Sequence, residues 1–106
     1  MSALGIGKEP FWTSATEGRS GIDRITLFDP SHLRSQIAGE IKGFDPLNYL
    51  DRKEVRDMDR ATQIAVAAAE EAKEDAGIAF NEHSGIVVGT GLGGITTDDE
   101  QHRVFY

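Results

Sequence analysis

Four glycines fall within six positions near the end of the chain, directly after a short run of β-branched residues. The stretch reads Ser84-Gly-Ile-Val-Val-Gly-Thr-Gly-Leu-Gly-Gly94, and the glycines are Gly89, Gly91, Gly93 and Gly94. A strand that ends in such a turn lets backbone or a ligand approach closely. Gly89, Gly91 and Gly94 also fit the G-x-G-x-x-G spacing, whose chemistry is a pyrophosphate held at a helix N-terminus. The glycines alone leave both a structural turn and a dinucleotide site open.

The residues that follow the glycines favour the structural turn. Thr97 and Glu100 have capping-box spacing, which predicts a helix over 97–105. Asp98, Asp99 and Glu100 would fill its first turn. These acids suit the positive end of the helix dipole, but they would repel a phosphate. We therefore expect a glycine turn without chemistry of its own.

No other set of residues has the spacing of a catalytic or metal site. The chain has no cysteine, which excludes a thiolate nucleophile, a thiolate metal site and a disulfide. Its three histidines, His32, His83 and His102, each stand among polar neighbours and are expected at the surface. We predict no catalytic residue, no metal and no cofactor within this chain.

Composition limits the classes of partner. The 106 residues carry a formal net charge of −7, which argues against nucleic acid because phosphate contacts need clustered lysine and arginine. The longest purely apolar run, residues 64–69, is too short to cross a bilayer, and no signal peptide is apparent at the start. We expect one partial domain over residues 1–106, no membrane partner and a cytoplasmic location.

The secondary-structure pattern is α/β. A short helix is expected over 8–17, with Phe11 and Trp12 as buried anchors, and short strands over 19–50, the best of them at 36–41. The clearest helix spans 51–76, begins at a capping box of Asp51 and Glu54, and ends at a glycine at position 77. A break near Asp59, acting as a second cap, is the alternative. A buried strand over 84–90 and the helix over 97–105 complete an α/β layout.

Several blocks of the chain, in order, resemble a known family. They are Gly18-Arg-Ser-Gly-Ile22, Phe28-Asp29, Ala38-Gly39, Phe44-Asp45, Leu50-Asp-Arg-Lys-Glu-Val-Arg-Asp-Met-Asp59, Ala76-Gly77 and Gly89-Thr-Gly-Leu-Gly-Gly94. This order is similar to the N-terminal part of β-ketoacyl-[acyl carrier protein] synthases, the elongating type II condensing enzymes. The block over 50–59 is fairly specific, and the resemblance covers essentially the whole chain.

The resemblance implies part of the N-terminal half of a thiolase-like fold, without the first strand and without the whole C-terminal portion. It implies acyl transfer and decarboxylative condensation with malonyl carrier protein in fatty-acid or polyketide biosynthesis, and a homodimer for the complete enzyme. The family's nucleophilic cysteine and two catalytic histidines fall beyond Tyr106. A fragment or truncated reading frame, inactive by itself, is therefore expected.

The resemblance implies a role for three residues of this chain. Leu92, inside the glycine turn, matches a position that lines the far end of the family's acyl pocket, although ordinary packing would also account for it. Lys53 and Arg56 match positions that contact the acidic carrier protein. Arg52, Arg56 and Arg60 recur every four residues, which places them on one face of the expected helix. Residues 51–60 hold four basic and four acidic side chains, however, so an ordinary solvated face remains open.

Two other classes of function stay open. One is a non-catalytic chain that retains the fold edge or the carrier contact. The other is a small nucleotide-binding α/β module.

Overall fold

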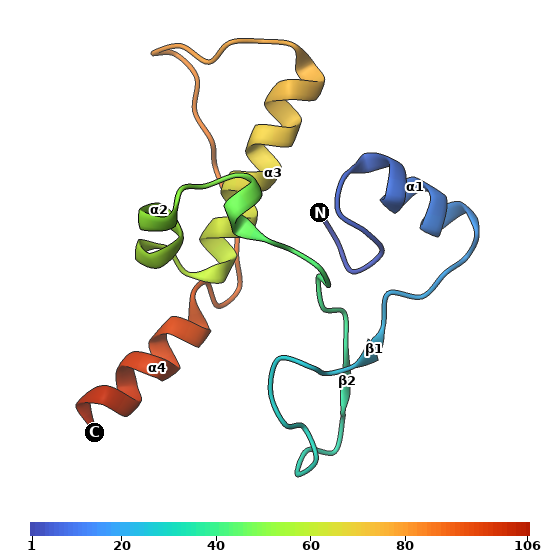
Figure 1. The fold of residues 1–106 in the computed structure, drawn as a ribbon, viewed down its shortest axis with the longest axis vertical. Helices are drawn as coiled ribbons and strands as arrows, with labels where there is room; N and C mark the ends of the chain where they lie inside the picture. The colour runs from blue at the N-terminus through green and yellow to red at the C-terminus, as the bar shows by residue number, and fades with distance from the viewer. The chain divides into compact units, whose positions relative to one another are not determined.

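A computed structural model describes residues 1–106, and the chain forms two compact units, Met1–Phe44 and Asp45–Tyr106. The first unit holds helix α1 (Lys8–Thr16) and strands β1 (Asp23–Arg24) and β2 (Ile37–Ala38). The second holds the 3-10 helix η1 (Pro46–Asn48), then α2 (Arg52–Asp57), α3 (Arg60–Ala76) and α4 (Ile95–Phe105) (Figure 1).

In the first unit, the helix predicted near the start of the chain is confirmed, and the predicted strand is shorter than expected. The expected helix over 8–17 is α1. The prediction that Phe11 and Trp12 are its buried anchors is wrong, since Phe11 is 43% and Trp12 64% exposed. The strand expected over 36–41 is reduced to β2, which pairs antiparallel with β1 in a two-stranded sheet. Past the paired residues, the Glu40 carboxylate accepts hydrogen bonds from the Thr26 and Leu27 amides. A side chain there replaces the backbone hydrogen bonds that a longer strand pair would make.

In the second unit, the long helix expected over 51–76 is divided at Met58. Asp51 and Glu54 form the predicted capping box of α2: Asp51 accepts from the Glu54 amide at 2.9 Å, and Glu54 accepts from the Asp51 amide at 2.9 Å. Met58 is extended, and α3 then starts afresh with Asp59 as its N-cap. The predicted break near Asp59 is confirmed, and the uninterrupted helix is wrong.

Gln63 stabilises the break between the two helices. Its side-chain amide donates to the backbone carbonyls of Val55 and Met58, both at 2.9 Å. The last carbonyls of a helix have no partner within it, so this amide replaces the bonds that a continuous helix would make. Gly77 ends α3 as predicted, in the left-handed conformation at φ 62°.

The 3-10 helix η1 lies against α3. The hydroxyl of Tyr49 donates to Glu71 at 2.8 Å, and this hydrogen bond raises the pKa of Tyr49.

Few side chains are fully enclosed. The buried apolar residues are Phe44, Leu50 and Ala67, and Ala67 on α3 has no exposed surface.

The strand expected over 84–90 is absent. The backbone of residues 85–89 pairs with no other segment, and Val87 is 99% exposed. The β-branched residues Ile86, Val87 and Val88 have the composition of a strand, but a strand needs a neighbour, and the 106 residues provide none at this place. No helix of the chain has the length and apolar character needed to cross a membrane.

Candidate functional site

The glycine turn is the segment that leads into α4. Gly93 adopts φ 58°, in the left-handed region, and its amide donates to the Thr90 hydroxyl at 3.0 Å. Gly94 follows as the N-cap of α4, and its carbonyl accepts from the Asp98 amide at 3.0 Å. The helix therefore begins at Ile95, two residues before the predicted start. Thr97 lies inside the helix and is not its cap, so the predicted capping box with Glu100 is wrong.

The start of α3 lies against this turn. Asp59 approaches Gly94 so closely that a Cβ at position 94 would be 2.8 Å from its Cγ. A hollow of about 220 Å³ lies between the two helix starts, lined by Asp59, Arg60, Ala61, Ile64, Gly93, Gly94, Ile95 and Thr96. Sequence reasoning missed this contact, because Asp59 and Gly94 are far apart in the chain; the only local signal was the expected cap at Asp59.

Asp59 is held as a carboxylate by the first turn of α3. Its Oδ1 accepts from the amides of Ala61 at 2.7 Å and Thr62 at 3.1 Å, and its Oδ2 accepts from the Thr62 hydroxyl at 2.9 Å. Hydrogen bonds from the Thr62 amide and then its hydroxyl hold the pKa of Asp59 below its usual range. A negative group next to Gly94 further disfavours a phosphate at this turn.

Leu92 lies on the turn with 76% of its surface exposed, and it does not line the hollow. Gly89 and Gly91 have open space on the side where a Cβ would lie. Within the described chain, the turn therefore presents Leu92 outward and does not bury it. Its proposed role in an acyl pocket remains a prediction.

Lys53 and Arg56 are both exposed on α2. The Nε atom of Arg56 lies 3.2 Å from Oδ1 of Asp57, and both side chains are largely exposed. Because α2 ends at Asp57, Arg60 belongs to α3, and the predicted single helix face of Arg52, Arg56 and Arg60 is wrong. Three exposed bases, Arg52, Lys53 and Arg56, remain on the short helix α2.

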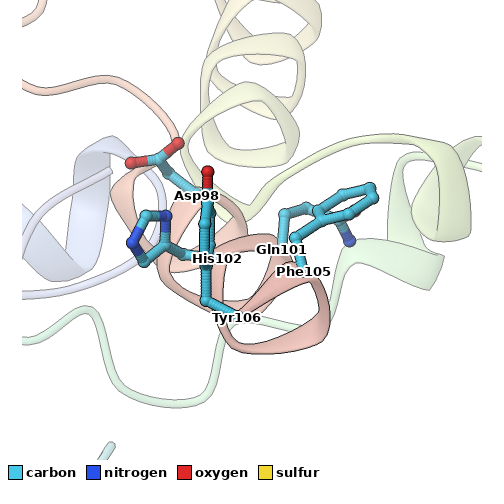
Figure 2. Close-up of a pocket in the computed structure, with 5 residues that line it drawn as sticks. All are labelled: Asp98, Gln101, His102, Phe105 and Tyr106. Atoms are coloured by element: carbon cyan, nitrogen blue, oxygen red, sulfur yellow. The ribbon is translucent and has the colours of Figure 1, made fainter.

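The histidines do not come together. His32 and His83 are exposed, and His102 is on α4, where its ring lies 4.7 Å from that of Tyr106. A hollow of about 400 Å³ along α4 is lined by Asp98, Gln101, His102, Phe105 and Tyr106. Figure 2 shows these five side chains on the helix. The chain has no group of three or more metal-ligating side chains that could hold an ion.

Comparison with known proteins identifies the family. Residues 1–105 match the model of the β-ketoacyl synthase N-terminal domain. The chain belongs to the β-ketoacyl synthase family. The resemblance found in the sequence blocks is thereby confirmed.

Named relatives of this family agree with the match. The chain is 37% identical over 108 residues to a protein of Synechocystis sp. named 3-oxoacyl-[acyl-carrier-protein] synthase 2, covering 98% of this chain and 26% of that protein. A Staphylococcus aureus protein of the same name is 38% identical over 107 residues, covering 97% and 27%. The chain thus spans about a quarter of the length of these β-ketoacyl synthases.

A solved structure supports the fold. The ishigamide ketosynthase/chain length factor superposes on 97% of this chain and 27% of its own with a TM-score of 0.78 at 34% identity. The expected fold class, part of a thiolase-like β-ketoacyl synthase, is confirmed.

Proposed function

We propose that this chain acts as the N-terminal segment of a β-ketoacyl-[acyl carrier protein] synthase, which joins an acyl group to a malonyl unit with loss of carbon dioxide. The observation that carries the proposal is the 37–38% identity, over 97–98% of the chain, to proteins named 3-oxoacyl-[acyl-carrier-protein] synthase 2. The product would be a ketoacyl thioester, made in the biosynthesis of a fatty acid or a polyketide. Residues 1–106 would work as one partial domain in a homodimeric enzyme.

The covalent step belongs to polypeptide outside these residues. An acyl group bound as a thioester needs a cysteine sulfur, and the chain contains none. The proposed role of these 106 residues is to contact the carrier protein and to line part of the acyl pocket. We predict no ketoacyl product when the 106 residues alone are incubated with acyl and malonyl carrier proteins.

Leu92 is the residue we assign to the acyl pocket. Just after it, the Gly93 amide donates to the Thr90 hydroxyl and Gly94 is the N-cap of α4, and the branched side chain of Leu92 stays exposed within the chain. An apolar side chain held at a fixed place is suited to close the end of an acyl tunnel that the rest of the synthase completes.

Lys53 and Arg56 are the residues we assign to carrier contact. Both are exposed on α2, whose first turn is held by the Asp51 and Glu54 capping box. Exposed bases on a fixed helix can attract an acidic partner even though the chain as a whole is acidic.

A chimera tests the proposal. In it, the 106 residues replace the matching N-terminal segment of the Synechocystis 3-oxoacyl-[acyl-carrier-protein] synthase 2, with which they share 37% identity. We expect ketoacyl product from acyl and malonyl carrier proteins. A folded, dimeric chimera with no condensing activity would refute the assignment.

The second candidate is a non-catalytic module that binds carrier protein. The observation that favours it is the exposure of the basic residues Lys53 and Arg56 on α2, within 106 residues that hold no cysteine. Carrier protein binding by the 106 residues alone, together with an inactive chimera, would support this alternative.

A further inference from the structure

The side chain of Asp59 occupies the space in which a side chain at position 94 would lie. A Cβ at Gly94 would lie 2.8 Å from both Cγ and Oδ2 of Asp59, and 3.2 Å from its Cβ. Separations under about 3 Å between carbon atoms are deeply repulsive in packed proteins. Glycine at this position therefore allows the two helix starts to approach.

The carboxylate has no easy way to move aside. Both of its oxygens are hydrogen-bonded at the start of α3, to the amides of Ala61 and Thr62 and to the Thr62 hydroxyl. These bonds satisfy amides that have no partner within the helix. Any displacement of Asp59 would therefore release the cap of α3.

Gly94 differs in this respect from its neighbours in the turn. Its φ of −84° is available to every residue, so its backbone does not require glycine. Gly93, at φ 58°, is a glycine for conformational reasons. A Cβ added at Gly91 would meet no atom within 4 Å, and the φ of Gly91 is not left-handed. Among these three, only Gly94 has a distant side chain in the space that a Cβ would occupy.

We propose that Asp59 is a positioning residue: its capped carboxylate, packed on Gly94, holds the glycine turn and Leu92 in place relative to α3. Leu92 precedes Gly94 by two residues, so a displacement of Gly94 moves the backbone next to Leu92. The consequence for substrate choice rests on the proposed pocket role of Leu92. The packing of the turn on α3 does not depend on that role.

A double-mutant comparison in the chimeric synthase tests the contact. The variants are Gly94→Ala, Asp59→Gly and their combination, with Gly85→Ala as control because Gly85 has an ordinary φ and open space around it. Hydrogen exchange is followed in peptides covering 59–66 and 90–98, and kcat/KM is measured for short and long acyl primers.

Gly94→Ala should speed exchange in both peptides about fivefold, the effect expected for loss of one helix cap. Asp59→Gly removes the colliding atoms, so adding Gly94→Ala to it should change exchange less than about twofold. Gly94→Ala should also change the ratio of kcat/KM for long over short primers, and Gly85→Ala should leave it unchanged. An equal effect of Gly94→Ala in both backgrounds would overturn the proposal.

The primer assay separates this proposal from the pocket assignment. If exchange shows the coupling but neither Gly94→Ala nor Leu92→Phe alters primer preference, Asp59 still positions the turn and the pocket role of Leu92 is wrong. If Leu92→Phe alters primer preference and Gly94→Ala does not, the positioning of Leu92 by Asp59 is overturned.

Discussion

Reversing both proposed carrier contacts, Lys53→Glu with Arg56→Glu, should weaken binding of carrier protein to the chimera. Exposed ion pairs are worth about 0.2–1 kcal/mol each, so losing two costs about 0.4–2 kcal/mol, or about twofold to thirtyfold in affinity. Arg56 should contribute at the low end, because Asp57 lies 3.2 Å from it and competes for its charge. Glutamate is favourable at position 53 in the first turn of α2 but unfavourable at position 56 in its last turn, so far-UV circular dichroism of the variant checks that the helix persists.

The assay compares kcat/KM for carrier-bound and free thioester substrates across a range of salt concentrations. The loss should affect only the carrier-bound substrate. It should also shrink toward 1 M salt, where charges are screened over about 3 Å. Equal loss with both substrates would mean that α2 was disrupted, and unchanged kinetics with the carrier-bound substrate would refute our reasoning.

Two further variants separate local from overall charge. Arg19→Glu with Arg34→Glu changes the net charge from −7 by the same amount at exposed sites outside α2, and it should leave carrier kinetics intact. Asp57→Asn frees Arg56 from its ion pair and should strengthen carrier binding. If the Arg19 and Arg34 reversal is as harmful as the α2 reversal, the effect is one of net charge, and α2 is an ordinary solvated face.

Three other predictions concern the pocket, the core and the helix cap. Leu92→Phe in the chimera should lower kcat/KM more for long than for short primers, by about 1–3 kcal/mol for overpacking; equal losses would assign Leu92 to ordinary packing. Ala67→Leu should lower the free energy of unfolding, measured by urea titration, by about 1–3 kcal/mol, because Ala67 is fully buried. As a control, Ala72→Leu at an exposed position of α3 should leave that free energy nearly unchanged. Asp59 has a lowered pKa when folded, so its contribution to stability is complete above its unfolded pKa of about 3.9 and is lost as the pH falls through the lower folded value. Asp59→Asn should flatten this acid dependence in unfolding titrations, and an unchanged dependence would contradict the assignment.

The features predicted correctly from the sequence depend on residues a few positions apart. The capping box of Asp51 and Glu54, the cap at Asp59 and the helix end at Gly77 each need only a side chain or backbone within one turn. Such contacts form wherever the chain turns helical, so residue type and spacing are sufficient to find them.

The wrong predictions share a dependence on distant partners. Val87 and its neighbours have the composition of a buried strand, yet a strand forms only against another strand, and no second strand pairs with them here. Phe11 and Trp12 were expected to be buried from their hydrophobicity, but burial requires an opposing surface. Residue type indicates what a segment can bury, and it does not indicate what will cover it.

The contact between Asp59 and Gly94 shows how two sequence blocks become one structural unit. Asp59 ends the fairly specific block over 50–59, and Gly94 ends the glycine turn over 89–94. Each block has a local explanation, a helix cap and a tight turn. Their packing explains why both are needed together. A residue at position 59 without a capping side chain would leave the first amides of α3 unpaired, and a Cβ at position 94 would lie 2.8 Å from Cγ of Asp59 and displace the cap. Two of the seven blocks that carried the family resemblance are therefore coupled by packing, and a substitution in either block should alter the structure of the other.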